Sequence, residues 1–300
     1  MILALLLAIA AALAEGQRPC PFQVVAGPDP SQTGDSGPAA SAYLFAPHGL
    51  GVDSAGNLYI ADTRNHRIRR VGSDGTIVTV AGNGTPGSGG DGGTAVAASL
   101  SAPEAVLAAA DGSFYVAATG NHRIRLVDGD GHITAVVGTG HPGFSGDRGP
   151  AVEAELRSPS GMALDSSGAL FFADTDNDRI RKVDLQGTIT TVAGTRNPAA
   201  TLPGCCSGGD GGPATSAHLL RPKGLAVGPD GTIYIADTNN NLVRRVAPDG
   251  TITTIAGTTN SNPSLPKYPA PALSPLGSAP GNVALLPTGP CSFRVSACSG

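Results

Sequence analysis

The sequence contains no tryptophan and only five tyrosines and seven phenylalanines among its 300 residues. Aromatic platforms on which bases or sugar rings stack are therefore scarce. Positive charge is also lacking, because 19 Lys and Arg stand against 23 Asp and Glu, which gives a formal net charge of −4. Binding to phosphates needs clustered Lys and Arg in excess, so nucleic acid is not expected as a partner.

Charged residues of both signs make up only 14% of the chain, whereas hydrophobic residues make up 40%. Chains that stay unfolded usually combine low hydrophobicity with high net charge. The 43 glycines and 25 prolines are therefore expected to punctuate a fold rather than to indicate disorder.

Long apolar runs are absent except for one, from Ile2 to Leu13, which ends in the small-residue spacing of a signal-peptidase site. At about a dozen residues it is too short to span a bilayer. We predict that residues 1–14 are a cleaved signal peptide and that the mature protein is secreted, with no membrane span after it. A buried N-terminal helix is the alternative.

Cysteine is also scarce, and none of the five lies in a CxxC pair or at metal-ligand spacing from a histidine. Disulfides are the default in a secreted protein, and an odd number leaves at least one thiol free or intermolecular. The adjacent Cys205 and Cys206 are too close to bridge each other. A bond from Cys20 to Cys291 or Cys298 would join the two ends of the chain.

A repeat of 56 residues is the strongest pattern in the sequence. The segment YIADTRNHRIRRV from Tyr59 returns from Tyr115, Phe171 and Tyr234. A second marker, GDSGPA from Gly34, returns with the same steps of 56, 56 and 63 residues. Self-similarity at a fixed period indicates a repeat architecture.

Each repeat contains four short segments of β type separated by Gly, Asn and Asp turns. In the first repeat these segments are 49–53, 57–61, 67–71 and 76–81. One such sheet cannot bury its own faces, so we predict an all-β fold, a β-propeller of stacked four-stranded blades. The four clear blades are expected near residues 47–82, 103–138, 159–194 and 222–257. One or two helical turns are expected after Pro38, Pro150 and Pro213.

A degenerate fifth blade is expected from the two ends of the chain. Residues 280–297 would supply its first two strands and residues 22–27 its outer strand, so that the N-terminal strand closes a propeller spanning residues 20–298. The Pro/Ser-rich residues 258–279 would then form an inter-blade loop. An incomplete propeller that closes by pairing with another chain is the alternative.

Residues 49–71 contain Gly-Leu-Gly-Val-Asp, then Gly-Asn-Leu-Tyr-Ile-Ala-Asp-Thr, then Asn-His-Arg-Ile-Arg. This pattern resembles the NHL repeat, a propeller family, and the resemblance extends over about residues 22–297. The long repeats with a Gly-Asp-Gly-Gly-Pro-Ala loop are similar to the NHL segments of teneurins and of many bacterial and algal secreted proteins. Family membership says little about chemistry, because propellers host binding, scaffolding and catalysis alike.

Charged residues that recur once per repeat are expected to be structural, because a ligand site usually breaks repeat symmetry. We predict pairing across each hairpin between an aspartate and arginines, with an anion-binding row as the alternative. The second repeat has Ala118 at the aspartate position and should be electrostatically weaker. The expected pairs involve Asp62 with Arg67 and Arg69, Asp174 with Arg179 and Arg181, and Asp237 with Arg244.

The aspartates of the Gly-Asp loops are expected to accept hydrogen bonds from backbone amides, and a role as cation ligands is the alternative. They are Asp35, Asp91, Asp147 and Asp210.

One position breaks the symmetry, the residue between proline and glycine at the entry to each first strand. It is His48, Glu104, Ser160 or Lys223 in the four clear repeats. These residues are expected near the mouth of a central channel, as candidates for ligand recognition or as a polar, hydrated lining. In an amidating lyase that resembles NHL proteins, zinc-binding histidines occupy this place in three blades. Here only His48 matches, so no cofactor is expected, with zinc or calcium as the alternative.

No residue pattern typical of a catalytic motif is present. We therefore predict a secreted, non-catalytic scaffold that binds a protein or a small extracellular ligand, and we leave its oligomeric state open. One alternative is a metal-dependent lyase or lactonase that uses His48 and Glu104 in the channel. Another is a structural matrix or wall component, suggested by the proline-rich loop and the odd cysteine.

Overall fold

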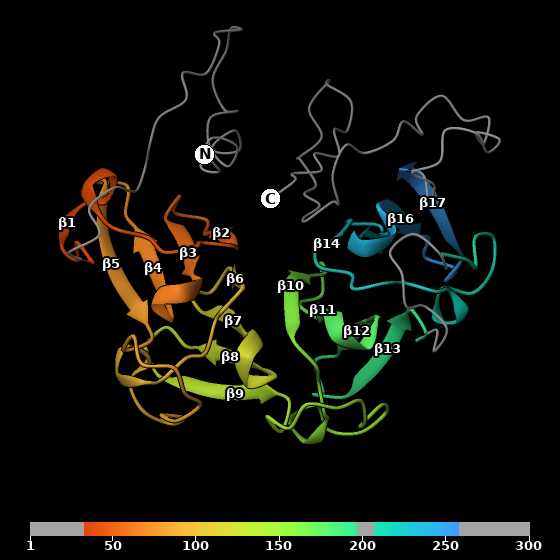
Figure 1. Ribbon diagram of the computed structural model, residues 1–300, viewed down its shortest axis with the longest axis horizontal. Coiled ribbons are helices and arrows are strands. Elements are labelled where there is room, and N and C mark those ends of the chain that lie inside the picture. Colours follow the sequence, from red (N-terminus) through yellow and green to blue (C-terminus); the bar gives the residue numbers. More distant parts are fainter. Residues whose placement is uncertain (1–32, 197–206, 258–300) are drawn as a thin grey trace, which may run out of the picture. The chain divides into compact units, whose positions relative to one another are not determined.

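A computed structural model describes residues 33–196 and 207–257. Within these ranges the chain is all-β, with four antiparallel sheets joined by loops and short 3-10 turns (Figure 1). The chain separates into two compact units, Met1–Val116 with Leu126–Thr134, and Ala117–Arg125 with Ala135–Gly300. The predicted all-β fold with four blades is confirmed.

The first sheet has the order β1-β5-β4-β3-β2. Its strands are β1 Gly37–Pro38, β2 Leu50–Val52, β3 Leu58–Asp62, β4 Arg67–Val71 and β5 Thr76–Ala81. Tight hairpins connect the strands because turn residues stand between them: the Asp53 carboxylate accepts hydrogen bonds from the amides of Ala55 and Asn57, and Gly75 has a φ of 77°. The strands β2, β3, β4 and β5 match the four predicted segments to within one residue, whereas β1 was not predicted.

The other three sheets repeat this arrangement, each with its four strands in sequential order. The second and third contain β6 Ala105–Ala108, β7 Phe114–Ala118, β8 Arg123–Val127 and β9 Ile133–Val137, then β10 Pro159–Leu164, β11 Leu170–Asp174, β12 Arg179–Val183 and β13 Ile189–Ala193. The fourth contains β14 Leu225–Val227, β15 Ile233–Asp237, β16 Leu242–Val246 and β17 Ile252–Gly257.

The predicted helical turns are present as single 3-10 turns of three residues. They are η1 Ala39–Ser41, η3 Ala95–Ala97, η5 Ala151–Glu153 and η7 Ala214–Ser216, and the first alanine of each is buried. A second set joins the second strand of each blade to the third: η2 Thr63–Asn65, η4 Thr119–Asn121, η6 Thr175–Asn177 and η8 Thr238–Asn240.

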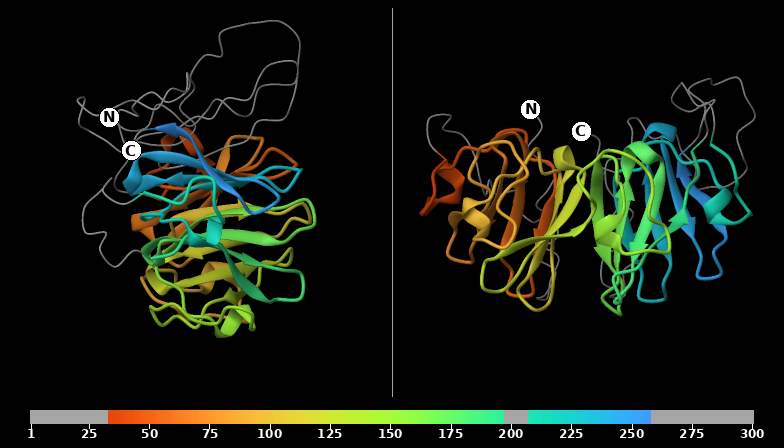
Figure 2. Two further views of the ribbon diagram at one scale, coloured as in Figure 1. Left: turned by 90° about the vertical axis from the view of Figure 1, so that its right-hand side faces the viewer. Right: turned by 90° about the horizontal axis from the view of Figure 1, so that it is seen from below.

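Within the second unit the third and fourth sheets pack against each other, and they are coloured green and blue in Figure 2. Their shared core includes Phe171, Ile180, Leu225 and Ile235, each at most 5% exposed. The innermost strands approach closely because Gly161 has no side chain: its amide bonds to the carbonyl oxygen of Lys223 at 2.8 Å. A Cβ atom at Gly161 would lie 2.3 Å from that oxygen.

Neighbouring repeats are also joined through the residue that directly follows η2, η4 and η6. In the first unit the amide of Ala102 donates to Nδ1 of His66 at 3.1 Å. In the second unit the amide of Ser158 donates to Nδ1 of His122 at 3.1 Å, and the amide of Arg221 donates to the Asp178 carboxylate at 2.8 Å. The histidine position of the NHL pattern is therefore an inter-repeat hydrogen-bond acceptor, which requires an unprotonated Nδ1.

This bond makes stability sensitive to mild acid. Burial, together with the charge of Arg157, lowers the pKa of His122, so the fold favours the neutral ring. As the pH falls below about 6.5 the unfolded chain takes up the proton first, and the contribution of His122 to the free energy of unfolding declines. We expect His122→Asn, the residue type at Asn241, to reduce this decline. Urea denaturation at neutral and mildly acidic pH tests it, and parallel profiles for the two proteins would contradict it.

Several predicted features lie outside the described residues. They are the signal peptide 1–14, the fifth blade from 22–27 and 280–297, the loop 258–279, and the disulfide candidates Cys20, Cys205, Cys206, Cys291 and Cys298. In the part of the chain that the structure describes, no helix has the length and apolar character needed to cross a membrane.

Candidate functional site

A buried arginine lies on the third strand of each of the four blades: Arg69, Arg125, Arg181 and Arg244 are at most 1% exposed. Before Arg69, Arg181 and Arg244 the pairing with the fourth strand shifts register, and such bulges re-aim a side chain. A guanidinium removed from water requires counter-charges and hydrogen-bond acceptors close by.

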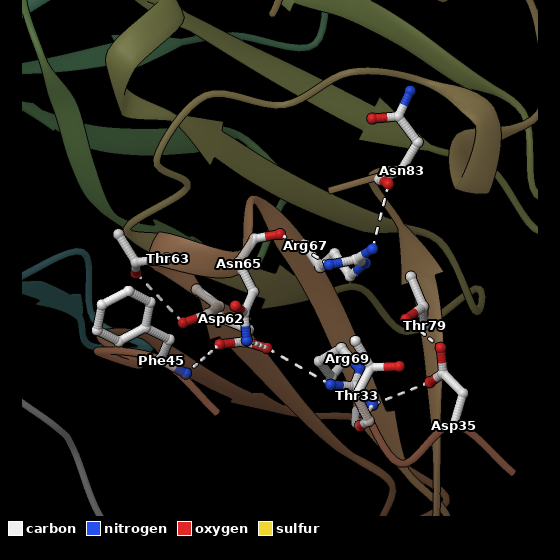
Figure 3. Close-up of polar contacts among 11 residues, drawn as sticks. Thr33, Asp35, Phe45, Asp62, Thr63, Asn65, Arg67, Arg69, Thr79 and Asn83 are labelled. Atoms are coloured by element: carbon white, nitrogen blue, oxygen red, sulfur yellow. Dashed lines mark hydrogen bonds and ion pairs between the residues drawn. The ribbon is translucent and has the colours of Figure 1, made fainter. Parts of the chain in front are cut away.

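In the first blade these acceptors surround Nη1 and Nη2 of Arg69 (Figure 3). Its Nη1 lies 3.5 Å from Oδ2 of Asp62, and its Nη2 lies 2.9 Å from Oδ1 of Asp35 and donates to the Thr33 carbonyl at 2.6 Å. The Asp62 carboxylate also accepts hydrogen bonds from the Phe45 amide and the Asn65 side chain, each at 2.8 Å. We call Asp35, Asp62 and Arg69 the ionic triad of this repeat.

The same triad occurs in the third and fourth repeats, entirely within the second unit. Arg181 lies 3.5 Å from Asp174 and 2.8 Å from Asp147. Arg244 lies 3.4 Å from Asp237 and 2.8 Å from Asp210. Burial raises the pKa of Asp174 and of Asp237 to about 6, against the opposing effect of their hydrogen bonds and arginines, so both carboxyls are ionised at neutral pH.

The loop aspartates have a partner that the sequence analysis did not assign. We expected Asp35, Asp147 and Asp210 to bond backbone amides, but each is an ion-pair partner of a buried arginine. Asp35 and Asp147 also accept hydrogen bonds from the hydroxyls of Thr79 and Thr191. The signal was present as a constant spacing, because each loop aspartate precedes its arginine by 34 residues.

The neighbouring arginines Arg67 and Arg179 have other partners. The guanidinium of Arg67 donates to the carbonyl oxygens of Asn65 and Asn83, each at 3.2 Å. Arg179 donates to the Asn177 carbonyl, and its guanidinium lies 3.8 Å from the centre of the Phe144 ring. Both arginines therefore hold loops in place next to the triad. In the second repeat the alanine at the aspartate position, Ala118, is fully buried and supplies no carboxylate.

The symmetry-breaking residues differ in how accessible they are. In the first unit His48 and Glu104 have side chains that are 46% and 26% exposed, and Nδ1 of His48 lies 4.0 Å from Oε2 of Glu104. In the second unit Ser160 is only 4% exposed. Its hydroxyl bonds to the Thr175 hydroxyl at 2.6 Å and to the Lys223 carbonyl at 3.0 Å. The structure thus leaves His48 and Glu104 accessible and ties Ser160 into the contact between blades.

No group of three or more His, Cys, Asp or Glu residues within 33–196 and 207–257 is arranged to hold a metal ion. In the first, third and fourth repeats a buried arginine instead forms ion pairs with two aspartates. Repeated sheets of four sequential antiparallel strands, three of them built around a buried arginine and two of them packed together through Gly161 in the second unit, define a repeat protein of the β-propeller type.

The chain belongs to the NHL-repeat family. The teneurin NHL domain matches residues 140–210 and 206–273, and the NHL repeat matches residues 46–71. Teneurin-1 of Mus musculus is 34% identical over 252 residues, and teneurin-4 of Homo sapiens is 31% identical over 249. These matches cover 75% and 72% of this chain but only 9% and 8% of the teneurins. The chain therefore spans less than a tenth of these relatives.

A more distant relative is the chloroplastic protein SUPPRESSOR OF QUENCHING 1 of Arabidopsis thaliana, 26% identical over 269 residues, which cover 67% of this chain and 25% of that protein. Among solved structures, an auxiliary nutrient binding protein from Bacteroides ovatus is 19% identical with a TM-score of 0.51, over 71% of this chain and 49% of its own. A candidate gluconolactonase is 16% identical with a TM-score of 0.50, over 84% and 71%. At these identities the similarity concerns the fold alone.

Proposed function

We propose that this protein is an exported NHL-repeat scaffold that binds a protein or a small ligand and does not catalyse a reaction. The observation that carries the proposal is the ionic triad. In the first, third and fourth repeats the recurring arginine and the strand aspartate are buried, and the more exposed loop aspartate is paired with the same arginine, so these residues stabilise blades. What differs between repeats is the residue at the entry to the inner strand, and there His48 and Glu104 remain accessible.

Recognition would then use these accessible side chains, each within its own unit. His48 and Glu104 offer a hydrogen-bonding ring and a carboxylate on one surface of the first unit. Lys223, half-buried in the second unit, offers an ammonium group. Side chains of different chemistry at equivalent places of similar repeats are suited to specific binding, as in other repeat proteins.

Site-specific photo-crosslinking tests the proposal. A photoreactive amino acid at position 48 or position 104, both in the first unit, in protein incubated with the extracellular medium of its source, is expected to capture the same partner. The matched control is position 185, because Leu185 is 65% exposed and lies in a hairpin turn far along the sequence from both. Equal capture at all three positions, or capture at none, would contradict a specific binding surface at the inner strands.

The second candidate function is a metal-dependent lyase or lactonase, and the 4.0 Å separation of His48 and Glu104 favours it. Elemental analysis of the purified protein distinguishes the two. For the scaffold we expect no stoichiometric zinc or calcium. A bound ion that is lost from the His48→Ala/Glu104→Ala double variant would overturn the scaffold and support the enzyme.

A further inference from the structure

The loop that follows β5 contains the tripeptide Asn83-Gly84-Thr85. Asn-x-Thr with x other than proline is the acceptor pattern for N-linked glycosylation, and it occurs in this sequence once. We propose that Asn83 is a glycosylation site and carries a single N-linked glycan. This inference rests on the proposed export, because the modification belongs to the secretory pathway.

The repeat indicates that the fold does not need asparagine at this position. Threonine stands at the equivalent places, 139 and 195, and the backbone contact is the same in all three repeats. The amide of Asn83 donates to the Ala98 carbonyl at 2.9 Å, that of Thr139 to Ala154 at 2.9 Å, and that of Thr195 to Ala217 at 2.8 Å. The side-chain amide of Asn83 is thus an addition specific to the first repeat.

The local geometry presents this amide to solvent. Asn83 and Thr85 are exposed, and Figure 3 shows the Asn83 side chain directed away from the guanidinium of Arg67, which its backbone carbonyl contacts. Gly84 faces the packed side, because a Cβ there would lie 2.3 Å from Nη2 of Arg67. The loop therefore has one side closed by Arg67 and one side open at Asn83.

The hydrogen bonds of the side chain are compatible with a bound sugar. Oδ1 of Asn83 accepts from the Thr85 amide at 2.8 Å, and this bond does not involve the reacting nitrogen. Nδ2 donates to the Ala97 carbonyl at 3.1 Å and to the Ser99 hydroxyl at 3.3 Å. Glycosylation replaces one of the two hydrogens on Nδ2, so one of these exposed bonds is retained and one is lost.

The step requires a lipid diphosphate-linked oligosaccharide and the oligosaccharyltransferase of the secretory pathway. The bond from the sugar anomeric carbon to the diphosphate oxygen breaks, and a bond from that carbon to Nδ2 of Asn83 forms. Nδ2 loses one proton to a base, and the lipid diphosphate leaves with the bonding electrons. No oxidation or reduction occurs.

Mass spectrometry of the native protein, recovered from the medium, tests the site. The tryptic peptide that contains Asn83 is expected to carry a glycan that peptide N-glycosidase removes. Digestion in ¹⁸O-labelled water marks the released site with heavy oxygen. Spontaneous deamidation at Asn83-Gly84 in ordinary water leaves it unmarked. An unmodified peptide in the exported protein would overturn the inference.

Variants of the full chain, expressed in a eukaryotic host behind the host's own leader, supply the controls. Asn83→Thr is expected to abolish the glycan without changing thermal stability, because threonine is the residue of the sibling repeats. Thr85→Ala should abolish it and Thr85→Ser retain it. Persistence of the glycan in Asn83→Thr would overturn the site. Because the host's own leader exports the protein, the glycan can be tested whether or not residues 1–14 direct export. A failure of residues 1–14 to direct export would contradict only the proposed function.

Discussion

Asp237→Ala is expected to lower the free energy of unfolding by about 3–5 kcal/mol at neutral pH, the cost of removing one partner of a buried ion pair. The carboxylate is fully buried and satisfies three groups: the Leu220 amide at 2.8 Å, the Asn240 side chain at 2.9 Å and Nη1 of Arg244 at 3.4 Å. Its removal leaves those donors in the blade interior without this acceptor. Denaturant titration followed by circular dichroism measures the loss.

The matched control for this prediction is Asp210→Asn, on the other side of the same arginine. The Asp210 side chain is 50% exposed, and asparagine keeps an acceptor for Arg244, so we expect a loss of at most about 1 kcal/mol. Similar losses for the two variants would contradict the distinction between a buried and a solvated counter-charge.

The pH dependence of Asp237 gives this prediction a second measurement. Because burial raises the pKa of Asp237 to about 6, the folded protein takes up a proton at a higher pH than the unfolded chain. The stabilising effect of that proton is fully present below a pH of about 4 and is lost as the pH rises through about 6. Asp237→Asn cannot titrate, so its free energy of unfolding should lack this fall between about pH 4 and 6.

Gly161→Ala is expected to destabilise the protein by about 2–4 kcal/mol, from overpacking and a weakened hydrogen bond. The added Cβ would lie 2.3 Å from the Lys223 carbonyl oxygen and 2.9 Å from Cα of Gly224. Both atoms belong to backbone, which cannot move aside as a side-chain tip can. The two inner strands would have to separate, which would weaken the bond from the Gly161 amide to Lys223.

Gly129→Ala is the control, because Gly129 also has an ordinary φ but no atom lies within 4 Å of the position of its Cβ. We expect its free energy of unfolding to change by at most about 0.5 kcal/mol. Thermal unfolding of both variants separates close packing from a general effect of replacing glycine. An equal loss at both positions would show that the contact with Lys223 is not the cause.

The strands could be predicted from the sequence because the same pattern of strand and turn residues occurs in each of the four repeats. Alternating apolar residues and Gly, Asn or Asp turns set the hairpins, and the segment 67–71 is β4 as predicted. The role of the loop aspartates could not be predicted in the same way. It depends on β1 pairing with β5, where Gly37 lies opposite Ile77, and this contact between distant residues brings Asp35 to Arg69.

The sequence positions of the candidate binding residues could be predicted, but the exposure and hydrogen-bond partners of their side chains could not. Comparing the repeats identifies the position of His48 and Ser160, because the residue between proline and glycine differs from one repeat to the next. Their exposure depends on the neighbouring strand. His48 extends to solvent, whereas the Ser160 hydroxyl reaches Thr175 and the Lys223 carbonyl and is satisfied there. Sequence spacing alone does not show whether the side chain at this position is exposed or is buried and hydrogen-bonded.

The Gly-Asp loop belongs to the blade that follows it, and this decides where the chain can be shortened. A fragment that began at Pro47, at the entry to the first strand, would keep all four long strands of the first sheet. It would nevertheless lose Asp35 and the Thr33 carbonyl, two of the acceptors around Arg69, together with β1. A stable N-terminal truncation therefore has to start at or before Thr33.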